Sequence, residues 1–229
     1  MRAHERAAPG MADGGRVGWH ASGLRPAVLW RSMDIFGFRL LLWMGRPALI
    51  QTLGPVEAAR VAREAPHKLR ELLPQIPDLG RPGARGFLVF TCMLVAVRRA
   101  CPTRSPAEAA QLLGDVFRSG ARWVPLPLRR LYRRIFFSPW YHKKLVDGTV
   151  GGGEAGFEGH LVKHPGGFGV DYSRCALQHF VRQIGEAELG PEICGLDDVE
   201  SEIFELGLVR TGTLGRGAKR CDFRWTKPG

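Results

Sequence analysis

The chain has 229 residues, of which 45% are hydrophobic and 9% aromatic, and this composition excludes a disordered protein. Its five cysteines are an odd number and no secretory signal precedes them, so a disulfide framework is not expected. The apolar run 35–50 contains Arg39, Arg46 and Pro47 and is shorter than the roughly 20 residues of a membrane-spanning helix. We therefore predict a cytoplasmic protein with no membrane segment. The net charge of +11 raises the question of nucleic-acid binding, which depends on where the charges lie.

The first 32 residues differ in composition from the rest of the chain. They are rich in glycine, alanine and arginine, and they carry five arginines against two acidic residues without an apolar period. Such a segment buries no hydrophobic face, so residues 1–32 are predicted to form a disordered basic tail. A helical region is predicted at 33–146 and an α+β region with three cysteines at 147–229, and the two are expected to form one compact domain.

Apolar residues spaced by three and four positions predict several helices after the tail. The expected helices lie at 33–44, from Pro55 onward and over 86–99. A further helix has a complete start signal, with Ser105 as N-cap, Pro106 at the first helical position and Glu108 at the third. The first half of the chain is therefore predicted to be helical.

A basic, aromatic helix is predicted over 128–145, with an interruption at Pro139. The stretch 122–144 holds seven positive charges and no acidic residue, interleaved with aromatic side chains. This mixture is expected where nucleic acids bind, but no nucleic-acid-binding motif accompanies it. We interpret the stretch as the solvated basic face of an amphipathic helix and expect no nucleic-acid partner.

The chain changes character at the glycine-rich stretch 147–156, which is predicted to be a linker or a mobile loop because it carries no phosphate-binding glycine motif. The elements expected after it are strands at 157–163 and 168–172 joined by a hairpin turn, a helix at 173–184, helical turns at 188–194 and 196–203, and strands at 206–214 and 220–225. This order predicts an α+β fold, in which an N-terminal helical region precedes a small antiparallel sheet packed with helices on one face.

Three cysteines in the last quarter, Cys175, Cys194 and Cys221, stand beside arginine, lysine or aspartate. Such surroundings lower the pKa of a thiol or recruit a metal. Cys175 lies near the first turn of a predicted helix, where unpaired amides favour a thiolate, and a position facing the core is an equal alternative. His179, one helical turn later, is either a general base for that thiol or a surface residue.

Cys194 and Asp197 are three residues apart, so they share one face of a helix and could ligate a metal or pair a thiol with a base. The alternative is that Asp197 is the N-cap of the following helical turn. Cys221 opens the last strand, where side chains alternate between faces. Cys221 is therefore expected on the opposite face from Asp222 and Arg224, and only one of Cys221 and Asp222 is expected to reach a site on the inner face.

The spacings between the three cysteines, 19 and 27 residues, match no standard zinc pattern, and no Cys-x-x-Cys pair is present. We therefore expect no cofactor, and keep a zinc site assembled from separate elements as the alternative. Cys92 and Cys101 belong to the helical region and are expected to be structural.

Between 172 and 224, a dispersed series of residues follows a recognisable order. The series is Arg174-Cys175, Phe180, Gly185, Glu188-Leu189, Pro191, Cys194-x-x-Asp197, Arg210-Thr-Gly-Thr213-Leu214 and Gly217-x-x-x-Cys221-Asp222-Phe223-Arg224. In this series the chain resembles the L-2-amino-thiazoline-4-carboxylic acid hydrolase family. The resemblance implies an α+β fold distantly similar to vinyl-reductase-type ligand-binding domains and to TRAPP-like proteins. The region 33–145 has the size of the family's first half but carries no motif that aligns.

The resemblance implies a bacterial hydrolase that opens a 2-amino-thiazoline ring with water, giving N-carbamoyl-cysteine. A cysteine thiolate would attack the C2 carbon, and the resemblance places Cys175, Cys194 and Cys221 among the catalytic residues, with Cys175 or Cys221 preferred as nucleophile. Asp197 or Asp222 would move the proton. A metal-activated water held by the cysteines and Asp197 is the competing mechanism.

Substrate binding is expected to involve Arg210, Thr213 and Arg224, because an arginine holds a carboxylate in a bidentate fork. The expected partner is a small-molecule substrate, such as a cyclic amidine from a natural-product pathway, and a homodimer is possible. The alternative function is a non-catalytic small-molecule-binding or metal-binding regulatory module of the vinyl-reductase-like type.

Overall fold

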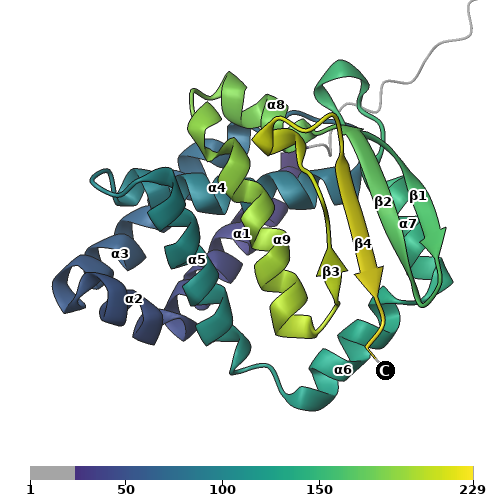
Figure 1. The fold of residues 1–229 in the computed structure, drawn as a ribbon. Helices are drawn as coiled ribbons and strands as arrows, with labels where there is room; N and C mark the ends of the chain where they lie inside the picture. Colours follow the sequence, from purple (N-terminus) through teal and green to yellow (C-terminus); the bar gives the residue numbers. More distant parts are fainter. Residues whose placement is uncertain (1–23, 229) are drawn as a thin grey trace, which may run out of the picture.

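The computed structural model describes residues 24–228, with side chains from residue 30 onward. The helices are α1 (Leu24–Met44), α2 (Arg46–Leu53), α3 (Pro55–Leu72), α4 (Pro82–Ala100), α5 (Pro106–Ala121), α6 (Leu126–Phe136), α7 (Pro139–Thr149), α8 (Ala176–Gln183) and α9 (Gly190–Phe204). The strands are β1 (Glu158–His164), β2 (Gly167–Arg174), β3 (Leu208–Val209) and β4 (Cys221–Thr226). Helices fill the first half and an antiparallel sheet lies in the second, which confirms the predicted α+β fold (Figure 1).

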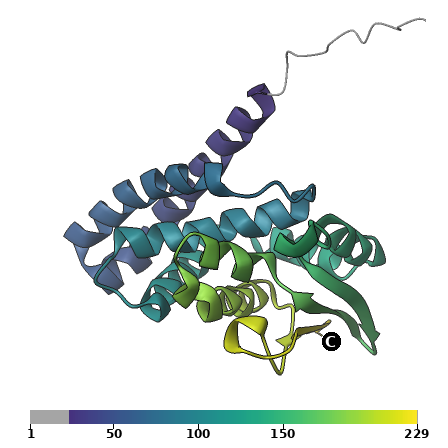
Figure 2. The same cartoon turned by 90° about the horizontal axis from the view of Figure 1, so that it is seen from above.

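Helix α1 begins nine residues before the start predicted from the sequence. Residues 24–32, which were predicted to belong to the disordered tail, are therefore helical, and residues 1–23 lie outside the described residues. The start was missed because the apolar residues between Leu24 and Trp30 are not apparent in the average composition of residues 1–32. The first turns of α1 project from the body of the molecule (Figure 2), whereas Phe38 and Leu42 on its inner face are fully buried.

The local start signals in the helical region predict the observed boundaries well. At α5, the backbone amide of Glu108 donates to Ser105 Oγ at 3.3 Å and the Ser105 amide donates to Glu108 Oε2 at 2.7 Å, which completes a capping box. The predicted basic helix is interrupted at Pro139, where α7 begins. Helix α7 continues to Thr149, so the first residues of the glycine-rich stretch are helical and not a linker.

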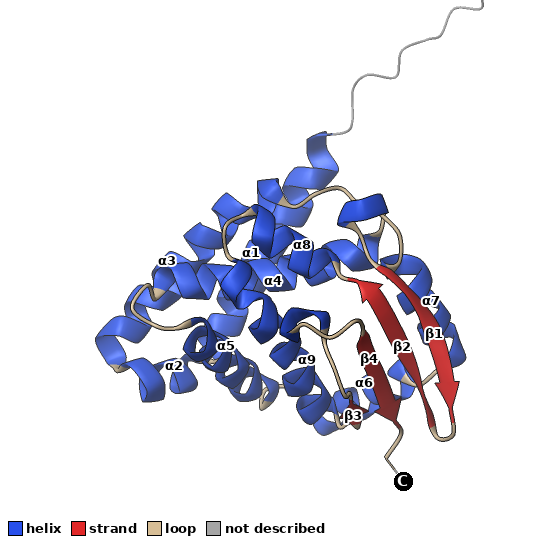
Figure 3. Ribbon diagram, turned by 45° about the horizontal axis from the view of Figure 1, so that its top comes forward, coloured by secondary structure: helices blue, strands red, loops and turns tan. Residues whose placement is uncertain are grey.

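The four strands form one sheet in the order β1-β2-β4-β3, and each neighbouring pair is antiparallel (Figure 3). Across β2 and β4, Tyr172 lies opposite Cys221 and Val170 opposite Phe223, and all four side chains are buried on the inner face. Asp171 pairs with Asp222 on the outer face. The alternation predicted for the last strand is thus confirmed.

Two elements of the second half differ from the prediction. Strand β3 is confined to Leu208–Val209, because the amides of Thr211 and Gly212 donate to the Asp222 carboxylate instead of extending the ladder. Helix α9 is one continuous helix where two separate turns were predicted. It lies between α5 and the sheet, so it connects the helical half of the chain with the half that contains the strands (Figure 1).

The helical region and the cysteine region share a hydrophobic core. Leu88 of α4 and Leu113 of α5 pack in one cluster with Phe180 of α8 and Leu189, and all four are fully buried. A smaller cluster around Phe168 joins α6 to the sheet. Within the described residues, every helix is too short or too polar to cross a bilayer.

Candidate active site

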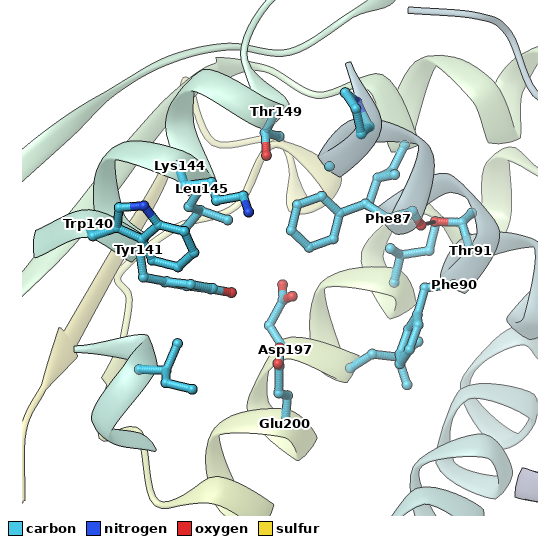
Figure 4. A pocket seen from close by; sticks show the side chains of 18 residues that line it. Phe87, Phe90, Thr91, Trp140, Tyr141, Lys144, Leu145, Thr149, Asp197 and Glu200 are labelled. Atoms are coloured by element: carbon cyan, nitrogen blue, oxygen red, sulfur yellow. Dashed lines mark hydrogen bonds between the residues drawn. The ribbon is translucent and has the colours of Figure 1, made fainter. Parts of the chain in front are cut away.

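A cavity of about 740 Å³ lies between α4, α7 and α9 (Figure 4). It continues inward into a recess of about 100 Å³ that reaches the inner face of the sheet. Both spaces are lined by Phe87, Tyr141, Leu145, Leu177, Ile193, Asp197 and Glu200. The outer part is mainly aromatic and aliphatic, and the inner part carries the sulfur atoms.

The recess brings together Cys175, Cys194 and Cys221, which lie far apart in the sequence. Cys175 precedes α8, Cys194 lies in the first turns of α9, and Cys221 opens β4. Cys194 and Cys221 are buried and Cys175 is half-buried, despite the polar residues that flank all three in the sequence. The structure therefore assembles the three cysteines at one site, as the resemblance implied.

Cys194 has the surroundings of a thiolate. Its pKa is lowered to about 6, first by a hydrogen bond from the Cys221 thiol; burial opposes this, and the Thr213 hydroxyl, the Arg210 charge and the Gly215 amide add to it. The Thr213 hydroxyl lies near Cys194 but is buried without a hydrogen-bond partner within the described residues. The directions of the two pKa shifts favour Cys194 over Cys221 as the ionised member of this pair.

The other two thiols are held in the neutral form. The hydrogen bond that Cys221 gives to Cys194 raises the pKa of Cys221, and burial raises it further, although its sulfur accepts from the Leu214 amide at 3.1 Å. Burial raises the pKa of Cys175 to about 11 and outweighs the amides at the start of α8. The expected thiolate at Cys175 is therefore wrong, because desolvation exceeds the effect of the helix end. His179 is exposed to solvent, on the surface.

Asp197 and Glu200 lie three residues apart on the face of α9 that lines the cavity. Burial raises the pKa of Asp197 to about 8, and the Cys194 charge raises it further against the opposing effect of Arg210. The pKa of Glu200 is also raised by burial, while its Oε1 accepts from the Tyr132 hydroxyl at 2.6 Å. Asp197 is thus a neutral acid near pH 7 beside a thiolate. Its alternative role as an N-cap is wrong, because α9 continues unbroken through it.

The Arg210 guanidinium binds groups of the protein itself and is not free to bind a ligand in the cavity. Its guanidinium lies 3.1 Å from Asp197 Oδ2 and 2.5 Å from Asp198 Oδ2, and it donates to the Cys194 carbonyl. Its side chain is only 10% exposed. Three acidic groups, Cys194 and the two aspartates, share this one guanidinium, so its charge offsets only part of the rise that burial causes in the pKa of Asp197. Arg210 positions the α9 residues and leaves no free fork for a substrate carboxylate.

Asp222 and Arg224 lie on the outer face of the sheet. The Asp222 carboxylate accepts from the Thr211 amide, the Thr211 hydroxyl and the Gly212 amide. Arg224 Nη1 lies 2.7 Å from Asp171 Oδ1. The catalytic role expected for Asp222 and the substrate-binding role expected for Arg224 therefore do not fit the geometry, because the alternation of side chains turns both away from the cavity.

The donor geometry does not favour a metal. In the described part of the chain, no group of three or more His, Cys, Asp or Glu side chains is arranged to hold a metal ion. The zinc alternative stays a prediction, and Cys221 gives a hydrogen bond to Cys194.

Several cavity residues come from the helical region and were not found from the sequence. Tyr141, Lys144 and Thr149 line the cavity from α7, and Glu200 lines it from α9. The spacing of three between Asp197 and Glu200 was the available signal for the second carboxylate. No comparable motif marks the α7 residues, whose shared face is recognisable only once the helix is known.

The segment that forms the site coincides with a known family. A family model described as L-2-amino-thiazoline-4-carboxylic acid hydrolase matches residues 89–225, more than half of the chain. The match begins within α4 and ends in β4, so it includes α7, α9 and all three cysteines of the recess but not the first two turns of α4. No curated protein and no solved structure gives a significant match. The chain belongs to the L-2-amino-thiazoline-4-carboxylic acid hydrolase family.

Proposed function

We propose that this protein is a cysteine-dependent hydrolase that opens a small cyclic amidine of the 2-amino-thiazoline-4-carboxylate type. The observation that carries the proposal is that Cys194 and Asp197, one turn apart on α9, line the same recess, where the pKa of the thiol is lowered and that of the carboxyl is raised. A nucleophile with a lowered pKa beside an acid with a raised pKa is the arrangement that acyl-type carbon chemistry requires at neutral pH. The family description supports a hydrolase, and the mechanism and substrate are the proposal.

In the first step, Cys194 Sγ attacks the C2 carbon of the ring and forms a new C–S bond. The bond between C2 and the ring sulfur breaks, and Asp197 gives its proton to the departing sulfur. The product of this step is an isothiourea in which the opened substrate is attached to Cys194. Asp197 is left as a carboxylate.

In the second step, a water molecule attacks the same carbon and Asp197 takes one of its protons. The second water proton moves to the amidine nitrogen as the carbon–Cys194 bond breaks, giving the urea of N-carbamoyl-cysteine. Cys194 leaves as the thiolate, stabilised by the Cys221 thiol and the Gly215 amide. One water has been added in total, and both side chains return to their starting protonation states.

The test is release of free thiol from 2-amino-thiazoline-4-carboxylate by the purified full chain. Cys194→Ala is expected to lose turnover by at least about a thousandfold while melting near the wild-type temperature. Cys92→Ala is the matched control, because Cys92 is an equally buried cysteine of α4 that does not line the recess. Mass spectrometry of the quenched reaction is expected to find the adduct on Cys194.

Three outcomes would contradict parts of the proposal. Turnover retained by Cys194→Ala but lost in folded Cys175→Ala would move the nucleophile. Turnover lost equally in Cys92→Ala would show that the effect is structural. Binding without thiol release in the wild type would exclude this substrate and favour the non-catalytic ligand-binding alternative.

A further inference from the structure

The wall of the cavity opposite the recess contains a buried hydroxyl without a partner. Thr149 is 1% exposed, and its Oγ1 makes no hydrogen bond within the described residues. Figure 4 shows this hydroxyl directed into the cavity. Leaving a buried polar group without a partner is energetically unfavourable, so such groups in folded proteins usually meet a ligand or an ordered water. Thr149 therefore marks a place where a polar ligand atom fits.

The same place lies at the beginning of α4, a helix of 19 residues. Its N-cap residue, Arg81, makes no capping hydrogen bond through its side chain. Pro82 has no amide hydrogen and the Arg85 amide donates to the Arg81 carbonyl, so the Gly83 and Ala84 amides are the donors of this helix end. Gly83 lines the cavity beside Thr149: a Cβ at Gly83 would lie 3.1 Å from Thr149 Oγ1 and 2.8 Å from the Gly148 oxygen. A glycine at this position allows the end of α7 to lie close to the start of α4, and a helix N-terminus favours an anion.

A positive charge completes the wall. The Lys144 ammonium lies 4.6 Å from the centre of the Trp140 ring and is directed into the cavity (Figure 4). Within the described residues it has no carboxylate in ion-pair range, whereas its neighbour Lys143 lies 2.5 Å from Asp147 Oδ2. The carboxyls that line the cavity, Asp197 and Glu200, belong to the opposite wall on α9. The charge of Lys144 is therefore available to a ligand.

We propose that the Thr149 hydroxyl, the Lys144 ammonium and the first turn of α4 form a binding subsite for the carboxylate of an apolar or aromatic carboxylic acid. The cavity holds about 740 Å³ and is lined here by Phe87, Phe90 and Trp140, so it accommodates an acid larger than a single five-membered ring. On the proposed function, on which this last step rests, the subsite binds the carboxylate of the substrate. It takes the role that the sequence assigned to Arg210 and Arg224.

The experiment measures binding of 2-naphthoate and of the neutral 2-naphthamide to the full chain by isothermal titration calorimetry. The acid is expected to bind at least about tenfold more tightly than the amide, a difference of about 1.4 kcal/mol. Thr149→Val, which keeps the shape, and Lys144→Gln are each expected to weaken the acid about fivefold to tenfold and leave the amide unchanged. Thr149→Ser is expected to restore binding of the acid, and Lys143→Gln is the matched control.

Equal affinities for acid and amide, no measurable binding of either, or an equal loss in Lys143→Gln would overturn the subsite. A second arm separates the subsite from the proposed function. With 2-amino-thiazoline-4-carboxylate, Lys144→Gln is expected to raise KM with little change in kcat. Preference for the acid without any turnover in the wild type would support the subsite and sink the hydrolase, whereas turnover without that preference would do the reverse.

Discussion

The two ends of the cavity differ in how their polar groups are satisfied. At the recess, Cys194, Cys221, Asp197 and Arg210 bind one another in a closed set of hydrogen bonds and charges. At the opposite wall, the hydroxyl of Thr149 has no protein partner in the described residues. Side chains that already bind one another are preorganised for chemistry, whereas polar groups without a protein partner are placed to bind a ligand. The recess therefore defines the reaction and the helical wall defines what is bound.

The two ends also come from different parts of the chain. The thiols and carboxyls of the recess come from the segment 172–224. The helical wall is formed by α4 and α7, whose relative position depends on the packing of helices. If this division is correct, substitutions at the recess should change kcat, and those at the wall should change KM and ligand preference.

The connection between the two ends should be the most sensitive point for stability. Phe168 of β2 is 1% exposed and contacts Phe136 of α6 and Trp225 of β4. Its ring also stacks on the His142 ring of α7, with 3.6 Å between the ring centroids. Phe168→Ala is expected to lower the free energy of unfolding by about 3–5 kcal/mol, because it removes a buried ring and leaves a cavity. Urea unfolding followed by circular dichroism measures this change.

The matched control is Phe36→Ala on the outer face of α1, where the ring is 69% exposed. Its effect is expected to stay within about 0.5 kcal/mol, because the substituted side chain is already in water. Similar losses in both variants would show that the ring cluster does not fasten the helical wall to the sheet.

Asp197→Asn tests the chemistry of the recess. The amide keeps an oxygen for Arg210 but has no proton to donate, so turnover of the thiazoline is expected to fall by about 100- to 1000-fold with little change in KM. Asp198→Asn is the control, because Asp198 also pairs with Arg210 but is exposed and outside the cavity lining. An equal loss in both variants would assign the effect to Arg210 and not to proton transfer.

The pH profile follows from the same two groups. Cys194 must be ionised, so kcat/KM is expected to rise with pH through about 6. Asp197 must be protonated, so kcat/KM is expected to fall again above about 8. On either side the rate should change about tenfold per pH unit, which corresponds to about 1.4 kcal/mol. Steady-state rates of thiol release across this range measure the profile, and Asp197→Asn should lose its alkaline limb. A profile that keeps rising above pH 8 would exclude Asp197 as the acid.

The sequence predicted best the features that depend on neighbours within a few residues. The capping box at Ser105, the interruption at Pro139 and the alternation around Cys221 all require only local geometry. The break predicted in α9 was wrong for the opposite reason. Asp197 has the type and position of an N-cap, but its carboxylate bonds Arg210, 13 residues further along the chain. A partner at that separation leaves no local signal.

The candidate site shows the same limit. The three cysteines could be placed together because the resemblance covers the segments that carry them. The charge state of each thiol could not be predicted from the sequence. Burial raises the pKa of Cys175 more than the helix end lowers it, and the hydrogen bond from the Cys221 thiol lowers the pKa of Cys194. The wall residues Lys144 and Thr149 could not be predicted at all, since their meeting with Gly83 requires the packing of α7 on α4.

The smallest expected effect concerns Asp222, which faces away from the cavity. Burial alone would raise the pKa of this carboxyl, but the Thr211 hydroxyl and the amides of Thr211 and Gly212 lower it below the ordinary 3.8. Asp222→Asn is expected to cost about 1–2 kcal/mol of unfolding free energy at pH 7, because charge-assisted hydrogen bonds are replaced by weaker ones. Turnover should stay within about twofold.

The pH dependence of this stability difference distinguishes a supporting role from a catalytic one. Because the pKa is lower in the folded state, the Asp222 contribution is complete above pH 3.8 and disappears as the pH falls through the folded value. Urea unfolding of both proteins at neutral and acid pH should therefore show the difference shrinking with acidity. A variant with wild-type stability but a tenfold loss of turnover would place Asp222 in the chemistry, and the outer face of the sheet would then contribute to the reaction.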